Sequence, residues 1–157
     1  MVVDTQNNLS PLITPFTEEH EMFRKSVRAF VDKEINPHVE AWEADELWPA
    51  HEVLQKMGAL GFLGLSYPVD YGGAEADIWF TVVLMEELGR IHCGGVPMGI
   101  SVHTDMCTPA LAKYGSHELK EKYLTPALRG EMVGCIGVTE PGAGSDVAGI
   151  ITRAERD

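Results

Sequence analysis

The sequence predicts a mainly α-helical fold, in which an amino-terminal helical bundle is followed by the first strands of a truncated β-domain. We place the helical domain at residues 1–130 and the beginning of the β-domain at residues 131–157. Apolar residues recur at helical spacing up to residue 130, and short β-branched runs appear only after it. With 157 residues, of which 45% are hydrophobic, the chain has enough material for one globular core.

The first helix is expected to follow a polar lead-in, residues 1–16, and to extend from Thr17 to about Asn36. The Thr17 hydroxyl can cap the amino end of this helix, and Pro37 lacks the N–H group that a continuing helix requires. Apolar side chains at helical spacing give this helix one face for the core: Phe23, Val27, Phe30 and Val31.

A second helix is expected over residues 49–58, because this segment begins at a proline and ends at a glycine. Its apolar face consists of Val53, Leu54 and Met57. Residues 61–73 then form a connector. The adjacent glycines Gly72 and Gly73 imply a turn there with backbone angles that other residues rarely adopt.

A third helix is expected to begin at Asp77. Its predicted apolar face consists of Ile78, Val82, Met85 and Leu88. Off this face lie Glu86, Glu87 and Arg90.

Two more helices are expected before residue 130. One extends over residues 98–113 in spite of Pro109, and Ser116 can cap the other. We expect Pro126 to end the last helix, because proline cannot continue the hydrogen-bond pattern.

The residue pattern changes after Gly130. Residues 133–138 are a short, apolar and partly β-branched run, which predicts a buried strand, and residues 147–154 predict a second one. Two short strands do not make an independently stable sheet, so we expect their partner strands on further sequence. The chain is therefore expected to be the amino-terminal part of a longer protein.

Charge and composition exclude several classes of protein. Twelve basic and 24 acidic residues give a formal net charge of -12, which disfavours binding to nucleic acid or anionic membranes. No run approaches the roughly 18 apolar residues of a membrane-spanning helix, so no membrane insertion is expected. The three cysteines lack C-x-x-C spacing and residues 1–11 do not resemble a targeting segment. We expect a cytoplasmic protein, or one of the mitochondrial matrix if this is a mature organellar form.

No metal site is expected. The histidines at 92, 103 and 117 lack the spacing to a carboxylate that a helical metal site requires, so surface or capping roles are expected for them. Cys107 and Cys135 lie in apolar surroundings and are expected to be small buried residues rather than nucleophiles.

The segment most informative about function is residues 137–149, with the sequence GVTEPGAGSDVAG. It places a hydroxyl at Thr139 after the predicted strand, and then a bend of residues so small that a flat ligand could reach the main chain. Ser145 and its neighbours present a hydroxyl and backbone N–H groups suited to a diphosphate. A plain strand-turn-strand connection explains the same glycines, and composition alone favours it. The segment matches neither the dinucleotide-binding fingerprint nor a Walker loop.

This run closely resembles the flavin-site signature of acyl-CoA dehydrogenases, with Thr139-Glu140, Gly144-Ser145-Asp146 and Gly149 in the signature positions. Further matches stand in the correct order along the chain: Phe23-Arg24, Tyr71-Gly72-Gly73, Glu86-Glu87-Leu88-Gly89 and Tyr114-Gly115-Ser116. The resemblance covers the amino-terminal helical domain and the start of the middle β-domain of that family.

The resemblance implies FAD as cofactor and an acyl-CoA as substrate. The FAD-binding positions that it assigns are Ile136, Gly137, Val138, Thr139, Gly144 and Ser145. Ser145 would also meet the thioester arm of the substrate, whereas Glu140 and Asp146 would shape the loop.

The family reaction is α,β-desaturation, in which a carboxylate removes the α-proton and the β-hydrogen leaves as hydride to flavin N5. That carboxylate comes from the carboxyl-terminal domain in the family, so no catalytic residue is assigned here. The 157 residues alone are expected to be inactive. An electron-transfer flavoprotein is the expected acceptor, and a homo-oligomer the expected assembly of the full-length protein.

One helix face is relevant to substrate length. Met98, Val102 and Met106 share a face at spacings of four residues, and the resemblance places this face beside the acyl chain. Core packing is the more common role of such a stripe. If the face lines the pocket, its lack of charge predicts tolerance of a medium or long acyl chain.

Two other functions remain open. The chain could be a non-catalytic helical binding module that serves as an interaction partner. It could also belong to a relative with different chemistry, such as an acyl-CoA oxidase, a nitroalkane oxidase or a flavin monooxygenase. The intact run at residues 139–146 favours a dehydrogenase.

Overall fold

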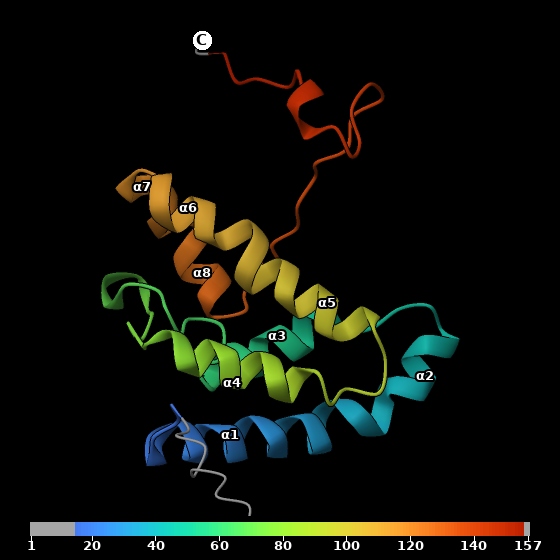
Figure 1. Ribbon diagram of the computed structural model, residues 1–157, viewed down its shortest axis with the longest axis vertical. Coiled ribbons are helices and arrows are strands. Elements are labelled where there is room, and N and C mark those ends of the chain that lie inside the picture. The colour runs from blue at the N-terminus through green and yellow to red at the C-terminus, as the bar shows by residue number, and fades with distance from the viewer. Residues whose placement is uncertain (1–14, 156–157) are drawn as a thin grey trace, which may run out of the picture.

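The computed structural model describes residues 15–155, so most of the predicted polar lead-in lies outside the described residues. The fold is helical, as predicted, and an arm beginning after residue 130 leads away from the helices (Figure 1). The α-helices are α1 (Glu18–Phe30), α2 (Val39–Ala44), α3 (Ala50–Ala59), α4 (Ile78–Leu88), α5 (Gly95–Ser101), α6 (Thr108–Tyr114), α7 (His117–Leu119) and α8 (Thr125–Leu128). No helix among the described residues is both long and apolar enough to cross a bilayer.

Helix α1 begins where the sequence predicts. The Thr17 hydroxyl accepts a hydrogen bond from the backbone N–H of His20, and the Thr17 N–H donates to Nδ1 of His20 at 2.9 Å. This reciprocal pair satisfies two N–H groups that the first turn leaves without partners. Nε2 of the same buried ring lies 3.1 Å from Oδ1 of Asp77, which caps α4 by accepting from the Trp79 N–H. One histidine therefore joins the amino ends of α1 and α4.

The predicted helix ends at Pro37 and Pro126 are wrong, because the chain stays helical through both prolines. A π-helical turn precedes each of them, at Val31–Ile35 and at Lys120–Leu124. Each proline then lies in the first turn of a new helical segment. N–H groups in a first turn make no hydrogen bond within their helix, so the absence of one at proline costs little there. A third π-turn, Val102–Cys107, precedes Pro109 and makes residues 95–114 continuous, close to the predicted helix 98–113.

The main core lies among α1, α3, α4 and α5, which Figure 1 shows stacked in layers. The predicted faces of α1 and α3 are confirmed for their core residues: Val27, Phe30, Val31, Val53, Leu54 and Met57 are all buried. Phe23 is partly buried and packs against this cluster. The connector turns at Gly72, whose φ of 90° is in the left-handed region that favours glycine.

The predicted face of α4 is confirmed at Leu88, and Met85 is partly buried against the core, but Glu87, expected off this face, is buried. The buried residues of this helix are Val83, Leu84, Glu87 and Leu88, whereas Ile78 is 63% exposed. Apolar residues occur on both sides of this helix, so their spacing does not determine which side faces the core. Glu87 faces inward because two arginines of α1, Arg24 and Arg28, donate hydrogen bonds to its carboxylate.

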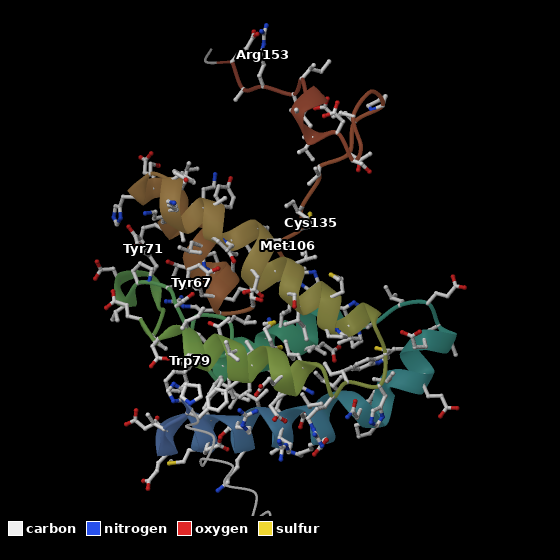
Figure 2. All side chains as sticks on the ribbon, in the orientation of Figure 1. Tyr67, Tyr71, Trp79, Met106, Cys135 and Arg153 are labelled. Carbon is white, nitrogen blue, oxygen red and sulfur yellow. The ribbon has the colours of Figure 1, made fainter. Side chains whose placement is uncertain are left out.

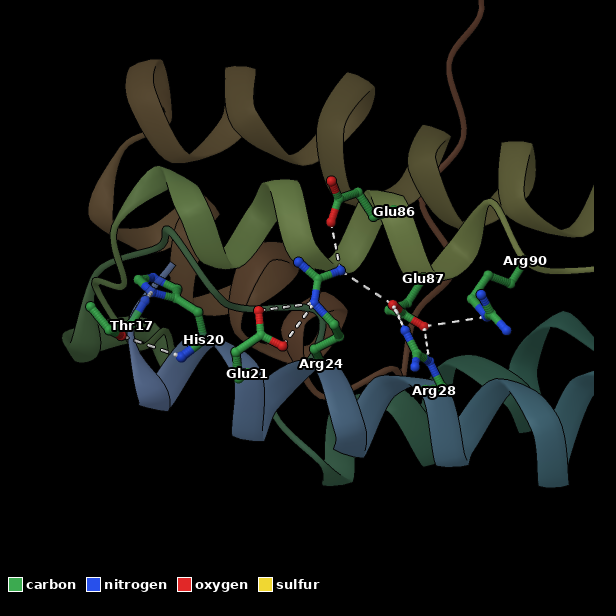
Figure 3. A network of polar contacts seen from close by, with 8 residues as sticks. All are labelled: Thr17, His20, Glu21, Arg24, Arg28, Glu86, Glu87 and Arg90. Carbon is green, nitrogen blue, oxygen red and sulfur yellow. Dashed lines mark hydrogen bonds and ion pairs between the residues drawn. The ribbon is translucent and has the colours of Figure 1, made fainter. Parts of the chain in front are cut away.

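Glu87 is the most buried carboxylate among the described residues, with 2% of its side chain exposed. Arg28 donates two hydrogen bonds to its two oxygens, at 2.9 Å from Nε and 2.7 Å from Nη2 (Figure 3). Arg24 donates a third at 3.2 Å, and Arg90 lies 3.6 Å away. The bonds from Arg28 in particular hold the pKa of Glu87 below its ordinary value. The carboxylate is therefore ionised inside the fold and ties α4 to α1.

Helix α3 approaches the end of α8 backbone to backbone. A Cβ added to Gly58 would lie 2.3 Å from the carbonyl of Arg129, and one on Gly130 would lie 2.1 Å from the carbonyl oxygen of Leu54. Gly130 also has a φ of 71°. Only glycine fits at these two positions, and this contact fixes where the helical part ends and the arm begins.

The two predicted strands are not formed. Residues 133–139 have no regular structure, Val147–Gly149 is a single 3₁₀ turn, and the one pairing in the arm of the described chain is an isolated bridge between Glu140 and Ala143. A strand is stabilised by hydrogen bonds to a neighbouring strand, and the described residues provide none. β-branched composition alone therefore did not determine strand formation.

We expect Glu87→Gln to lower the free energy of unfolding by about 2–3 kcal/mol, because the arginines lose a buried anionic acceptor. Urea unfolding followed by circular dichroism measures this. The folded-state pKa is lowered, so the wild type should lose this advantage as the pH falls below the ordinary value of 4.5. Glu86→Gln is the matched control, because Glu86 also contacts Arg24 but is 49% exposed, and it should cost under about 1 kcal/mol. Equal losses in both variants would contradict the role given to Glu87.

Candidate functional site

The segment with the predicted chemistry, residues 137–149, forms a compact turn on the arm. The N–H of Glu140 donates to the carbonyl of Ala143 at 2.8 Å, and the N–H of Ala143 donates back at 3.1 Å. Ala143 is 4% exposed, and its neighbours on both sides are exposed. The turn therefore folds over one small side chain and presents its other residues outward.

The carboxylate of Glu140 connects this turn to residues 151 and 152 near the end of the arm. Its Oε2 accepts from the N–H of Ile151 at 3.0 Å, and its Oε1 accepts from the N–H of Thr152 at 2.8 Å. These bonds, the one from Ile151 first, lower the pKa of Glu140. A carboxylate whose two oxygens are both occupied and whose proton affinity is reduced is poorly suited to accept a proton from a substrate.

Three glycines of the segment leave open space beside the main chain. A Cβ added to Gly137, Gly142 or Gly144 would meet nothing within 4 Å, and none of the three has a positive φ. Neither the backbone conformation nor the packing of the described chain thus requires glycine at these positions. The open space would admit a flat ligand against the backbone, so these residues fit the cofactor that the sequence implies.

The remaining predicted cofactor-binding residues are all on the exposed surface of the arm. Ile136 is 48% exposed and Val138 is 41% exposed, and Thr139 and Ser145 also face solvent. Gly137 and Gly144 are exposed as well. The side chains available to a ligand there are two apolar ones and two hydroxyls.

The predicted substrate-facing stripe lies on the helix beneath the arm. Met98 in α5 is 57% exposed, Met106 in the π-turn is 46% exposed, and Val102 is partly buried. Core packing within the described chain therefore does not explain the two methionines. Figure 2 labels Met106 on this helix and Cys135 at the start of the arm.

His103 holds the arm to this helix, a role that its sequence position did not reveal. Its expected surface or capping role is wrong, because its side chain is 0% exposed. Its Nδ1 accepts from the Gly134 N–H at 2.9 Å, and its Nε2 lies 3.0 Å from the carbonyl of Ala127. The signal that could have identified it is helical spacing, since the buried face of this helix consists of Val96, Ile100, His103, Thr104 and Thr108.

The remaining histidines and cysteines considered in the sequence are His92, His117, Cys107 and Cys135. His92 and His117 are exposed, as expected, and His117 Nδ1 lies 3.1 Å from the hydroxyl of Tyr71. Cys107 is partly buried, and burial raises the pKa of its thiol. Cys135 is exposed, so its expected burial is wrong.

Comparisons with known proteins identify the family. Residues 17–131 match the family model described as "Acyl-CoA dehydrogenase, N-terminal domain". The chain is 41% identical over 142 residues to the long-chain specific acyl-CoA dehydrogenase of Mus musculus, covering 90% of this chain and 32% of that protein. It is 37% identical over 130 residues to the short-chain specific acyl-CoA dehydrogenase of Clostridium acetobutylicum, covering 83% of this chain and 34% of that protein.

The fold agrees with a solved structure of the same family. The acyl-CoA dehydrogenase of Bacillus anthracis, solved in complex with FAD, superposes with a TM-score of 0.80 at 32% identity, covering 87% of this chain and 23% of that one. The chain spans about a third of the length of the curated relatives it matches. On the match of residues 17–131 and these likenesses, the chain belongs to the acyl-CoA dehydrogenase family and contains its amino-terminal helical domain.

Proposed function

We propose that this chain forms one wall of the FAD and acyl-CoA site of an acyl-CoA dehydrogenase. The reaction removes a proton from the α-carbon and a hydride from the β-carbon of an acyl-CoA thioester, and bound FAD supplies the hydride acceptor. The observation that carries this proposal is the open backbone at Gly137 and Gly144, in a segment that resembles the flavin signature of the family to which the chain belongs.

Two parts of the arm, residues 136–139 and residues 144–145, are proposed to contact different parts of the cofactor. Residues 136–139 offer backbone groups, two apolar side chains and the Thr139 hydroxyl to the flavin ring. Gly144 gives access to the main chain, and the Ser145 hydroxyl is a donor for the region where cofactor and thioester meet. These groups bind and orient the ligands and carry no proton chemistry.

The proton acceptor of the reaction is proposed to lie outside this chain. Glu140 and Asp146 both adjoin proposed flavin residues in the sequence, and both oxygens of Glu140 already accept backbone N–H groups. The helix stripe of Met98, Val102 and Met106 is proposed to line the acyl chain. Its exposure and lack of charge favour a medium or long chain.

The partners and location of the complete protein are also proposals. An electron-transfer flavoprotein is proposed to accept the electrons, and a homo-oligomer to be the working assembly. The cytoplasm or the mitochondrial matrix remains the predicted compartment. An acyl-CoA oxidase is the second candidate function, and the reaction of the reduced enzyme with oxygen distinguishes it from a dehydrogenase.

The direct test uses the complete gene product. We expect it to purify with a flavin absorption spectrum and to lose the flavin band when acyl-CoAs of increasing length are added without oxygen. A flavin spectrum that no acyl-CoA bleaches would contradict the reaction, and a protein that binds no flavin would favour the non-catalytic binding module. Rapid return of the band on admission of air would favour the oxidase.

We expect Gly144→Ala to weaken FAD binding about tenfold, equivalent to about 1.4 kcal/mol, because the added methyl group would occupy space proposed for the cofactor. Fluorescence titration of the flavin-free protein with FAD measures the change. Gly94→Ala is the matched control, since its Cβ also meets nothing within 4 Å but lies at the amino end of α5. Unchanged FAD affinity in Gly144→Ala would remove Gly144 from the site.

We expect Val102→Phe in the complete protein to shift the preferred substrate to a shorter acyl chain, because the larger side chain would shorten the proposed pocket. The measurement is kcat/KM for acyl-CoAs of different length. Val69→Phe, on an exposed 3₁₀ turn, should leave the profile as it is. A profile that Val102→Phe does not change would show that the stripe does not contact the acyl chain.

A further inference from the structure

A single buried imidazole connects the proposed substrate stripe to the proposed flavin segment. His103 belongs to the same π-turn as Val102 and Met106, and its ring is 0% exposed. Because the Gly134 N–H donates to its Nδ1, its own proton must be on Nε2, which donates to the carbonyl of Ala127. Burial lowers the pKa of this histidine, which favours the neutral ring that both bonds require.

The arm passes this ring at very short range. A Cβ added to Gly134 would lie 2.3 Å from Sγ of Cys107 and 3.3 Å from Nδ1 of His103, so any side chain there would force the Cys107 thiol to move. Between residues 15 and 155, this is the hydrogen bond farthest along the arm that reaches the helices. The flavin segment begins two residues later, at Ile136. An extended chain rises by about 3.3 Å per residue, so the segment starts within about 7 Å of the anchor.

We infer that His103 is a positioning residue, which sets the place of the flavin segment 136–139 relative to the acyl-lining stripe through its bond to Gly134. This rests on the proposed function, because the stripe and the segment are taken as the two sides of one site. A shift of the arm at Gly134 changes the distance between the proposed flavin residues and Met106. The bond to Ala127 has a separate effect: it holds the same ring to α8 and so keeps Nδ1 directed at the arm.

Two amide variants separate the two bonds of the ring. Asparagine places its carbonyl oxygen where Nδ1 was, so His103→Asn keeps an acceptor for Gly134 and loses the donor to Ala127. Glutamine places its amide group near the position of Nε2, so His103→Gln keeps the donor to Ala127 and loses the acceptor for Gly134. Each variant removes one hydrogen bond from the same buried site, and asparagine, the smaller side chain, leaves the larger cavity. A general loss of stability would therefore not make His103→Gln the more affected variant.

The experiment uses the complete FAD-loaded protein and measures hydrogen exchange at Gly134 together with the dissociation constant of FAD. His103→Gln is expected to speed the exchange of Gly134 and to raise the FAD dissociation constant, each by about tenfold, the effect of losing one such hydrogen bond. His103→Asn is expected to stay within about twofold of the wild type in both. Equal changes of FAD affinity in the two variants would mean that burial of the ring matters and not the bond to Gly134, and would overturn the inference.

A second measurement needs no variant. If the bond between His103 and Gly134 supports FAD binding, FAD must in turn stabilise that bond, because coupling between two equilibria is reciprocal. Adding FAD to the flavin-free wild type should therefore slow the exchange of the Gly134 amide. Binding of FAD without any change at Gly134 would overturn the inference. Absence of FAD binding would instead contradict the proposed function, while the exchange of Gly134 in His103→Gln would still test the bond itself.

Discussion

The packing of the helical domain depends on one buried anion, the carboxylate of Glu87. A charge taken out of water is very costly unless it is paired and hydrogen-bonded, and here two arginines of α1 supply three hydrogen bonds to it. These bonds are directional, so they fix the rotation of α4 about its own axis as well as its contact with α1. Hydrophobic burial alone would not do this, since α4 has apolar side chains on several sides.

The rotation of α4 has consequences for the rest of the core. It turns Val83, Leu84 and Leu88 into the same cluster as the apolar face of α1 and as Val96 and Ile100 of α5. The helix of residues 95–114 is thereby held with its buried face inward and with Met98 and Met106 on the outside. The exposure of Met98 and Met106, which we propose to line the acyl chain, is thus a consequence of how the opposite face is packed.

Local chemistry made much of the fold predictable. Thr17 and Ser116 act as caps as expected, because a side-chain oxygen next to free N–H groups requires no tertiary context. The helix ends predicted at Pro37 and Pro126 were wrong because a π-turn can absorb a proline, and nothing in the local sequence distinguishes a proline that ends a helix from one that follows such a turn. The inward side of α4 and the anchor at His103 depend on partners about 60 and 30 residues away, so local periodicity could not specify them.

The glycine-rich run was informative for the opposite reason, since the fold of the described chain does not require its glycines. Gly58 and Gly130 are required by close backbone contacts within the chain, whereas Gly137, Gly142 and Gly144 border open space. A glycine that neither packing nor backbone conformation requires lowers the stability of the folded protein, because glycine adds conformational entropy to the unfolded state. In our proposal, binding of a ligand against the backbone offsets this cost. Gly94 also borders open space, so it is the grouping of three such glycines in the flavin-like run that supports the site we propose on the arm.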